Sequence, residues 1–379
     1  MSDMTFREMN VRVFNGEPLP HVFFQPRITS WIEFKRMNSG LDLPEDWKTK
    51  DMRDIHRELD VSMRYLMDYV PPESPIELLF DKEVKRIETG DQKTRVRSTT
   101  TPYGDLVEKH HFTADGFWRE TEFMVKTAAD LKPFRWLLDH MHYEFNADKF
   151  ERGSAYMGDL GEPQFYLPKS PYQAMLQSWS ALLPTTYLLM DEKEEMEAIF
   201  HQLDALSDKL FEQIAAYGKV RIINVGENLH QSLMSPRIFE QYYIPFYEKR
   251  LADLHNANVF CHIHVDGDCK NILPYFKQMS FDGYEAVTPV PQGDVTLEEV
   301  RDAIGDKVLL DGIPGIYFLP NVPREKLIEC VETLADYFHP RLVLGASDEV
   351  PQGSDSVEAA KRVAMIARWC RTGEWKESV

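Results

Sequence analysis

The segment VFCHIHVDGDCKNILPYFKQMSFDGYEAVTP, residues 259–289, decides the fold class of this chain. It begins with an apolar, β-rich run, VFCHIHV. It continues through CKNILPYFKQMS, whose apolar residues recur at spacings of three and four, and ends in a second strand-like run, GYEAVTP. A strand, a helix and a strand in this order form a right-handed βαβ unit. The segment therefore predicts a parallel sheet that is covered by helices.

The same alternation is repeated on both sides of this segment. Further strand-like runs are RIINVGE (221–227), VLLDGIP (308–314) and RLVLGAS (341–347), and stretches with helical spacing separate them. No GxGxxG motif follows a strand, which disfavours a nucleotide-binding open sheet. We therefore predict an α/β fold, a (β/α)8 TIM barrel whose main part spans residues 151–379.

The first 150 residues follow a different pattern. DMRDIHRELDVSMRYLMDYV has helical spacing, and EVKRIETGDQKTRVRSTTTPYGDLVEKHHF alternates like strands around two turn sequences, TGDQ and TPYG. TAADLKPFRWLLDHM then predicts a helix with a threonine cap. We predict that residues 1–150 form an N-terminal extension, with helices and an antiparallel hairpin, that packs on the barrel. It either covers the open end of the barrel or only adds packing.

Composition disfavours nucleic acid as a partner and gives no sign of a membrane protein. The 379 residues carry 62 Asp and Glu against 43 Lys and Arg, a formal charge of −19, and no basic stripe that could follow a phosphate backbone. Neither a signal-like start nor a long apolar stretch is present, so we expect a cytoplasmic protein without membrane contact. Four scattered cysteines do not suit a disulfide framework. The oligomeric state stays open, with a homodimer as one option.

Candidate site residues gather where the predicted strands end. His262, His264 and Asp266 are two residues apart, so they project from one face of a strand toward its carboxyl end, where barrel enzymes carry their chemistry. Polar groups at the ends of the other predicted strands are Glu227, Asn228, Glu285, Asp311, Ser347 and Asp348.

Imidazole and carboxylate groups are competent ligands for zinc or a similar divalent metal. The pattern suggests His262, His264 and Glu285 as ligands, with Asp348 or Ser347 as a further one. The structural alternative is that the histidines are hydrogen-bonded core residues. Glu285 is the hardest to explain in that way, because a carboxylate on a buried strand needs a cation or hydrogen-bond donors to offset its desolvation.

Part of the chain resembles a known superfamily. LMSPRIFEQYYIPFYEKRLADLHNANVFCHIHVDGDCKNILPYFKQMSFDGYEAVTP, followed by DVTLEEVRDAIGDKVLLDGI, resembles the uroporphyrinogen decarboxylase superfamily of (β/α)8 barrels, most clearly over residues 219–370. Its corrinoid-dependent methyltransferase branch binds a metal through a His-x-Cys motif on this strand and through later ligands. By the resemblance, His262 matches the histidine, His264 replaces the cysteine, Glu285 matches the downstream acid, and the last cysteine falls near Ser347–Asp348.

A shell of nitrogen and oxygen ligands suits an oxygen group better than a thiol. The resemblance therefore implies an O-demethylase component: a methyltransferase that moves a methyl group from a methoxylated, aromatic compound to the Co(I) of a corrinoid protein. Zinc or another divalent metal would activate the ether oxygen. Glu227 or Asp266 would orient a ligand histidine or protonate the oxygen. The residues predicted to bind substrate are Arg27, Asn228 and Asp311.

Two alternatives remain. One is a decarboxylase or another carbon–carbon lyase that uses Arg27, Asp311 and the histidines as acid and base groups. The other is a non-catalytic protein that binds a tetrapyrrole or a corrinoid.

Overall fold

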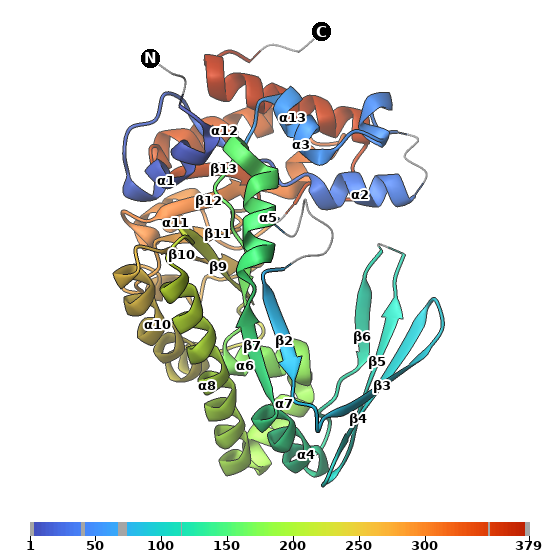
Figure 1. Ribbon diagram of the computed structural model, residues 1–379. Helices are drawn as coiled ribbons and strands as arrows, with labels where there is room; N and C mark the ends of the chain where they lie inside the picture. Colours follow the sequence, from blue (N-terminus) through green and yellow to red (C-terminus); the bar gives the residue numbers. More distant parts are fainter. Residues whose placement is uncertain (1–3, 39–41, 67–73, 115, 348, 376–379) are drawn as a thin grey trace.

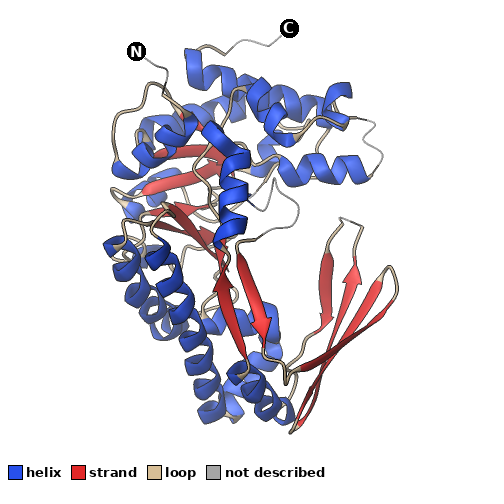
Figure 2. Ribbon diagram, in the orientation of Figure 1, coloured by secondary structure: helices blue, strands red, loops and turns tan. Residues whose placement is uncertain are grey.

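The computed structural model describes residues 4–38, 42–66, 74–114, 116–347 and 349–375. Its centre is a seven-stranded parallel sheet in the order β1-β13-β12-β11-β10-β9-β8. Figures 1 and 2 show strands of this sheet among helices. The predicted parallel sheet is thereby confirmed. The strands are β1 (Phe23–Phe24), β8 (Tyr166–Leu167), β9 (Ile222–Leu229), β10 (Phe260–Val265), β11 (Gly283–Glu285), β12 (Val308–Ile313) and β13 (Leu342–Ala346).

Helices cover the sheet, which explains its composition. Every residue of β11, β12 and β13 is buried, as expected for parallel strands whose two faces are both packed. The helices that follow β8 in the chain are α6 (Pro171–Ala174), α7 (Leu182–Asp191), α8 (Lys193–Tyr217), α9 (Pro236–Ile238), α10 (Ile244–Asn256), α11 (Leu297–Ile304), α12 (Arg324–Phe338) and α13 (Ser356–Thr372). No described helix combines the length and the apolar character that crossing a bilayer requires.

One predicted helix is much shorter than expected. Residues 269–280 form turns around a single 3-10 segment, Leu273–Tyr275. Pro274 lacks the N–H that an α-helix would need at this position. Phe276 and Met279 are buried all the same, so the apolar spacing reflects burial without an α-helix.

The segment Val61–Leu66 lies between the two edges of the sheet. Within the described residues 51–66, the helix predicted for residues 51–70 is present as α3 (Met52–Leu59), and the chain then turns at Asp60, whose φ is 52°. Residues 67–70 of that prediction lie outside the described residues. Ser62 N donates to Phe24 O at 3.1 Å, and Leu66 N donates to Gln164 O at 2.9 Å. These bonds connect the segment to β1 and to the residues that enter β8. Both β1 and this segment come from the range 1–150 that was assigned to the extension.

The remainder of that range contains α1 (Phe6–Asn15), α2 (Thr29–Met37) and two antiparallel sheets. The strands pair around the two expected turn sequences (Figure 1). The predicted threonine-capped helix is α4, where Thr127 and Asp130 form a capping box. The strands are β2 (Ile76–Phe80), β3 (Lys85–Gly90), β4 (Thr94–Thr101), β5 (Gly104–Phe112), β6 (Trp118–Glu122) and β7 (Met141–Phe145). The helices are α4 (Ala128–Asp139) and α5 (Ala147–Met157), and α5 extends past the predicted boundary at residue 150.

Candidate functional site

Strained backbone marks the carboxyl ends of the central strands. Asn228, Ala286 and Asp311 have φ values of 54°, 58° and 76°, although none of them is glycine. Each such conformation costs about 1–3 kcal/mol and persists only where the surroundings hold it in place. The three residues lie at the ends of β9, β11 and β12, which is the region where the sequence predicted a site.

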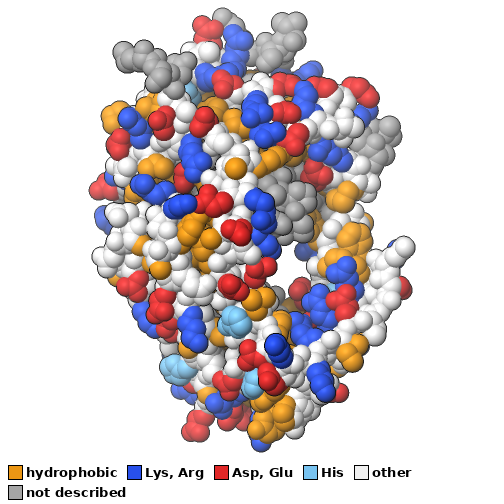
Figure 3. Space-filling model, viewed as in Figure 1, with side chains coloured by type: hydrophobic (Ala, Val, Ile, Leu, Met, Phe, Trp, Pro, Cys, Tyr) orange, Lys and Arg blue, Asp and Glu red, His pale blue; other side chains and the backbone are white. Residues whose placement is uncertain are grey.

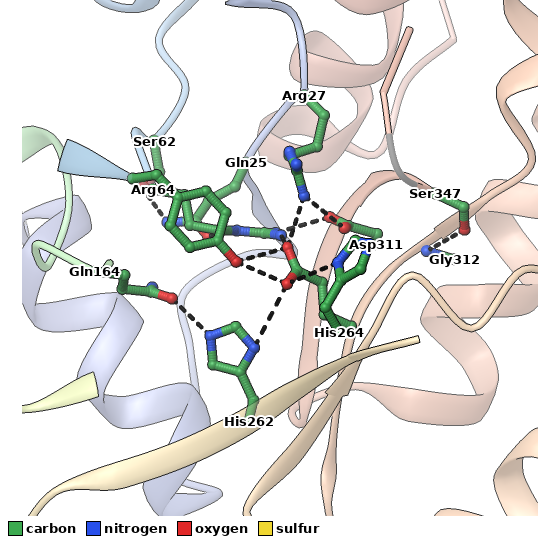
Figure 4. A network of polar contacts seen from close by, with 12 residues as sticks. Gln25, Arg27, Ser62, Arg64, Gln164, His262, His264, Asp311, Gly312 and Ser347 are labelled. Carbon is green, nitrogen blue, oxygen red and sulfur yellow. Dashed lines mark hydrogen bonds and ion pairs between the residues drawn. The ribbon is translucent and has the colours of Figure 1, made fainter. Parts of the chain in front are cut away.

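Arg27, Arg64, His262, His264 and Asp311 belong to a buried polar cluster at the carboxyl ends of these strands (Figure 4). Glu285 is the centre of this cluster. Its side chain is fully buried, and Oε1 accepts hydrogen bonds from Arg27 Nη1 at 2.6 Å and from Arg64 Nη1 at 2.8 Å. The Tyr65 hydroxyl lies 2.7 Å from each of the two carboxylate oxygens, and Asn224 Nδ2 donates to Oε2. The donors that a buried carboxylate needs are thus supplied by protein groups.

Both histidines of β10 project toward this carboxylate, as the alternation predicted. His264 Nδ1 lies 3.2 Å from Glu285 Oε2, and His262 Nδ1 lies 3.8 Å from the same atom. His262 also lies between two side-chain amides: its Nε2 is 2.8 Å from Gln164 Oε1, and its Nδ1 is 3.1 Å from Asn224 Nδ2. Burial lowers the pKa of His262 to about 3, so this imidazole is neutral at pH 7.

Asp311 belongs to the same cluster and has no exposed surface. Its Oδ1 is 2.8 Å from Arg64 Nη2, and its Oδ2 is 3.4 Å from Arg27 Nη1. A Cβ atom at Gly345 on the neighbouring strand would lie only 2.4 Å from Asp311 Oδ1. A glycine at position 345 is therefore what allows the carboxylate to lie there.

The ionisable groups of the cluster shift one another's pKa values. Burial raises the pKa of Asp311, although Arg64 and Arg27 oppose this shift. Burial alone would raise the pKa of Glu285, but the Arg27 guanidinium and His264 hold it well below its usual range. Burial alone would lower the pKa of Arg64, but the neighbouring Asp311 and Glu285 carboxylates raise it. Two guanidinium groups therefore face two carboxylates.

These side chains do not fit a divalent metal as they are arranged. Both oxygens of Glu285 already accept hydrogen bonds, and both ring nitrogens of His262 lie against amides. Two guanidinium groups also lie next to the carboxylate that would have to bind the ion. Among the described residues, no group of three or more His, Cys, Asp or Glu side chains could hold a metal ion. Asp348, the other predicted ligand, lies outside the described residues, and Ser347 Oγ accepts a hydrogen bond from Gly312 N at 3.2 Å.

A cavity of about 720 Å³ adjoins the cluster. Arg27 and His264 are its two lining residues that belong to the cluster, and we call them the cavity floor. Tyr166 and Trp179 form part of the walls, and Phe117 from the β5–β6 connection is a third aromatic lining residue. A concave site with apolar walls and a few polar groups is typical of small-molecule binding. The space-filling view shows the molecule hollowed between its main body and the four-stranded antiparallel sheet (Figure 3).

The other predicted site residues lie in two places. Asn228 and Asp266 line the cavity, and Asp266 is exposed. Glu227 is buried to one side, where Ser170 N donates to its Oε2 at 3.1 Å. Burial raises the pKa of Glu227, although the nearby Lys169 ammonium opposes this shift.

Several residues of the cluster were not predicted. Arg64 and Tyr65 follow α3 in a run that has helical spacing, and nothing in that run indicates two polar side chains directed into the sheet. Asn224 lies two residues after the start of β9, between apolar neighbours. The only signal in the sequence is that a buried carboxylate at Glu285 needs a partner. This need does not indicate which residues provide the partner.

Comparison with known proteins adds information about the fold. No family model and no curated protein matches the sequence. A solved methyltransferase from Methanosarcina mazei matches over 96% of this chain and 98% of its own, with a TM-score of 0.52 and 14% identity. A B12-independent methionine synthase from a Shewanella species covers 83% of this chain and 85% of its own, with a TM-score of 0.41 and 10% identity. At 14% identity, the likeness to the first protein shows a shared fold. Membership of the uroporphyrinogen decarboxylase superfamily stays a prediction.

Proposed function

We propose that this chain is an enzyme that transfers a methyl group from a methoxylated aromatic compound to the Co(I) of a separate corrinoid protein. The observation that carries the proposal is the cavity, whose walls include Tyr166 and Trp179 and whose floor is Arg27 and His264. Aromatic walls suit a planar ring, and a polar floor suits the oxygen of its methoxy group. The fold shared with a methyltransferase supports this class of reaction.

We also propose that the sheet closes as the predicted (β/α)8 barrel, with Val61–Leu66 in the place of an eighth strand. The support is the set of hydrogen bonds that connects this segment to Phe24 on one side and to Gln164 on the other. In such a barrel the cavity lies at the carboxyl-terminal face, where barrel enzymes carry their active sites.

The reaction is a displacement at the methyl carbon. The bond between the methyl carbon and the ether oxygen breaks, its electron pair stays on the oxygen, and the carbon forms a bond with cobalt. The cavity has to orient the ring so that the oxygen lies at the floor and the methyl group remains accessible to the cobalt. His264 contributes by position: Glu285 lies 3.2 Å from its Nδ1, and the side chain lines the cavity.

The experiment is an assay with reduced corrinoid protein and a panel of methoxylated arenes, in which the visible spectrum of cobalt reports methylation. His264→Ala should lower the rate by about 100-fold, the size of effect expected when one positioned polar group is lost. His201→Ala, an exposed histidine on α8, is the matched control and should retain the full rate. Failure of every arene to methylate the cobalt would contradict the proposal.

A carbon–carbon lyase is the second candidate, and one observation favours it. The Arg27 guanidinium at the cavity floor could pair with a substrate carboxylate as well as with a phenolic oxygen. A decarboxylase would release carbon dioxide from an aromatic acid without any corrinoid. Mass spectrometry of the same arene panel, extended with carboxylated compounds and run without the corrinoid protein, separates the two reactions.

A further inference from the structure

The positive charge at the cavity floor is carried by a guanidinium group that still has hydrogen-bond donors to offer. Both hydrogen bonds of Arg27 use the same atom, Nη1, which donates to Glu285 and Asp311. Within the described part of the chain, its Nε and Nη2 donate to no protein acceptor, although the side chain is only 8% exposed and lines the cavity. A buried guanidinium group with unused hydrogen-bond donors is suited to bind an anion.

The rest of the cluster holds this guanidinium in place. Glu285 accepts a hydrogen bond from it, and the centroid of the Tyr65 ring lies 5.3 Å from the guanidinium carbon. Arg64 forms an ion pair with the other carboxylate, Asp311, and donates a hydrogen bond to Glu285 itself. The cluster therefore sets two guanidinium groups against two carboxyl groups before a ligand arrives, and it lacks the surplus negative charge that attracts a divalent cation.

We infer that Arg27 forms a metal-free oxyanion site at the cavity floor and that its ligand is the phenolate oxygen released when the methyl group leaves. The identity of this ligand rests on the proposed function. As the carbon–oxygen bond breaks, its electron pair collects on the oxygen, where the Nε and Nη2 hydrogens of Arg27 stabilise it. Donors that are already in place for a developing charge need no reorganisation during the reaction. The guanidinium thus takes the role that a metal ion was predicted to have.

The first test measures binding without turnover. The probe is 4-nitrophenol, whose coloured phenolate allows the ionised fraction to be read from the absorbance. Protein treated with a chelator should bind the phenolate and increase its fraction at a pH where the free probe is half ionised. Arg27→Gln should weaken phenolate binding by about tenfold or more, and Arg27→Lys by less, because lysine keeps the charge but not the fork of donors.

The controls separate a local effect from misfolding. Arg301→Gln changes an arginine on α11 that lies outside the cavity lining, and it should bind the probe like the unmodified protein. The circular dichroism spectrum of each variant should match that of the parent. No binding by the unmodified protein, or equal binding by Arg27→Gln, would overturn the inference.

The second test measures metal content directly. Protein expressed in metal-replete medium and purified without chelator should contain far less than one divalent ion per chain. A stoichiometric metal that is lost in His264→Ala would overturn the metal-free site while leaving methyl transfer intact. Conversely, phenolate binding through Arg27 without any cobalt methylation would retain the site and remove the proposed function.

Discussion

At the scale of single residues, we expect the stability of the buried cluster to depend on the negative charge of Glu285. Its carboxylate is fully buried and accepts hydrogen bonds from Arg27 and Arg64. Glu285→Gln removes the negative charge and leaves two buried guanidinium groups with one carboxylate, Asp311. Breaking a buried ion pair from one side typically costs about 3–5 kcal/mol.

We therefore expect Glu285→Gln to lower the free energy of unfolding by about 3–5 kcal/mol, measured by urea denaturation. Glu325→Gln, at an exposed position on α12, is the control and should change this free energy by less than about 0.5 kcal/mol. Equal stability of the Glu285→Gln variant and the parent would show that the two arginines do not need this carboxylate.

Gly345 gives a second test at the same scale. An added Cβ atom would lie 2.4 Å from Asp311 Oδ1 and 2.7 Å from Gln25 O, which is closer than nonbonded atoms approach. Gly345→Ala should lower the free energy of unfolding by about 1–3 kcal/mol, as overpacked sites do. Gly353→Ala is the matched control, because a Cβ atom there would meet nothing within 4 Å. Chemical denaturation of both variants makes the comparison. If Gly345→Ala left the free energy of unfolding unchanged, Asp311 would have room to move.

The approach of the two histidines to Glu285 could be predicted from sequence, but the partners of Glu285 could not. Alternation along one strand and parallel pairing with the next place His264 directly opposite Glu285, and both patterns are local. Arg64 and Arg27 lie 221 and 258 residues from Glu285 along the chain. No short pattern connects residues at such separations. For this reason the need of Glu285 for a partner was clear, while the choice between a metal and a guanidinium was not.

At the scale of elements, a three-residue ion cluster joins α12 to α13. Arg324 on α12 and Arg362 on α13 both donate to Glu358, at 2.7–2.8 Å. The hydrogen bonds from Arg324, together with those from Arg362, lower the pKa of Glu358 from 4.5 to about 2. A carboxylate whose pKa is lowered by folding stabilises the protein above its unfolded pKa, and this contribution is lost as the pH falls through the folded pKa.

We therefore expect the stability contributed by the ion cluster of Arg324, Glu358 and Arg362 to depend on pH. Glu358→Gln should lower the melting temperature at pH 7, and the difference from the parent should shrink as the pH falls from about 4.5 toward 2. Glu329→Gln is the control: its side chain is 69% exposed and pairs with Lys326, whereas that of Glu358 is 20% exposed. Exposed pairs of this kind contribute little. A difference that stays constant across this pH range would show that the charge of Glu358 is not what stabilises the helix pair.

The elements that sequence predicted best are those whose signal is local. The βα units from β9 to β13 each contain an apolar run and a turn. Each strand could therefore be predicted from its own segment, without knowing which strands lie beside it in the sheet. Strand β1 has only two residues, and Val61–Leu66 is joined to the sheet by a few hydrogen bonds, so neither leaves a periodic pattern. The segment 269–280 shows the opposite error: its spacing suits a helix, but Pro274 interrupts it.

At the scale of the whole molecule, the cavity is built by parts of the chain that are far apart in sequence. The sheet provides Arg27, beyond the end of β1, and His264, on β10. Residues from the antiparallel strands and their connections provide Leu78, Phe117 and Tyr143. The antiparallel region therefore contributes to the wall of the cavity, and its contribution can be tested apart from the stability of the fold.

Phe117 allows ligand binding to be tested separately from the stability of the fold. Its side chain lines the cavity, yet the residue is 48% exposed, so it contributes little to the packed core. Phe117→Ala should weaken the binding of an aromatic ligand such as 4-nitrophenol by about two- to tenfold, the value of one aromatic contact, and leave the unfolding midpoint unchanged. Ile87→Ala, on the same antiparallel sheet but 61% exposed and outside the cavity lining, is the control and should change neither quantity. Unaltered binding by Phe117→Ala would mean that this side chain only borders the cavity and that the ligand is held by the sheet alone.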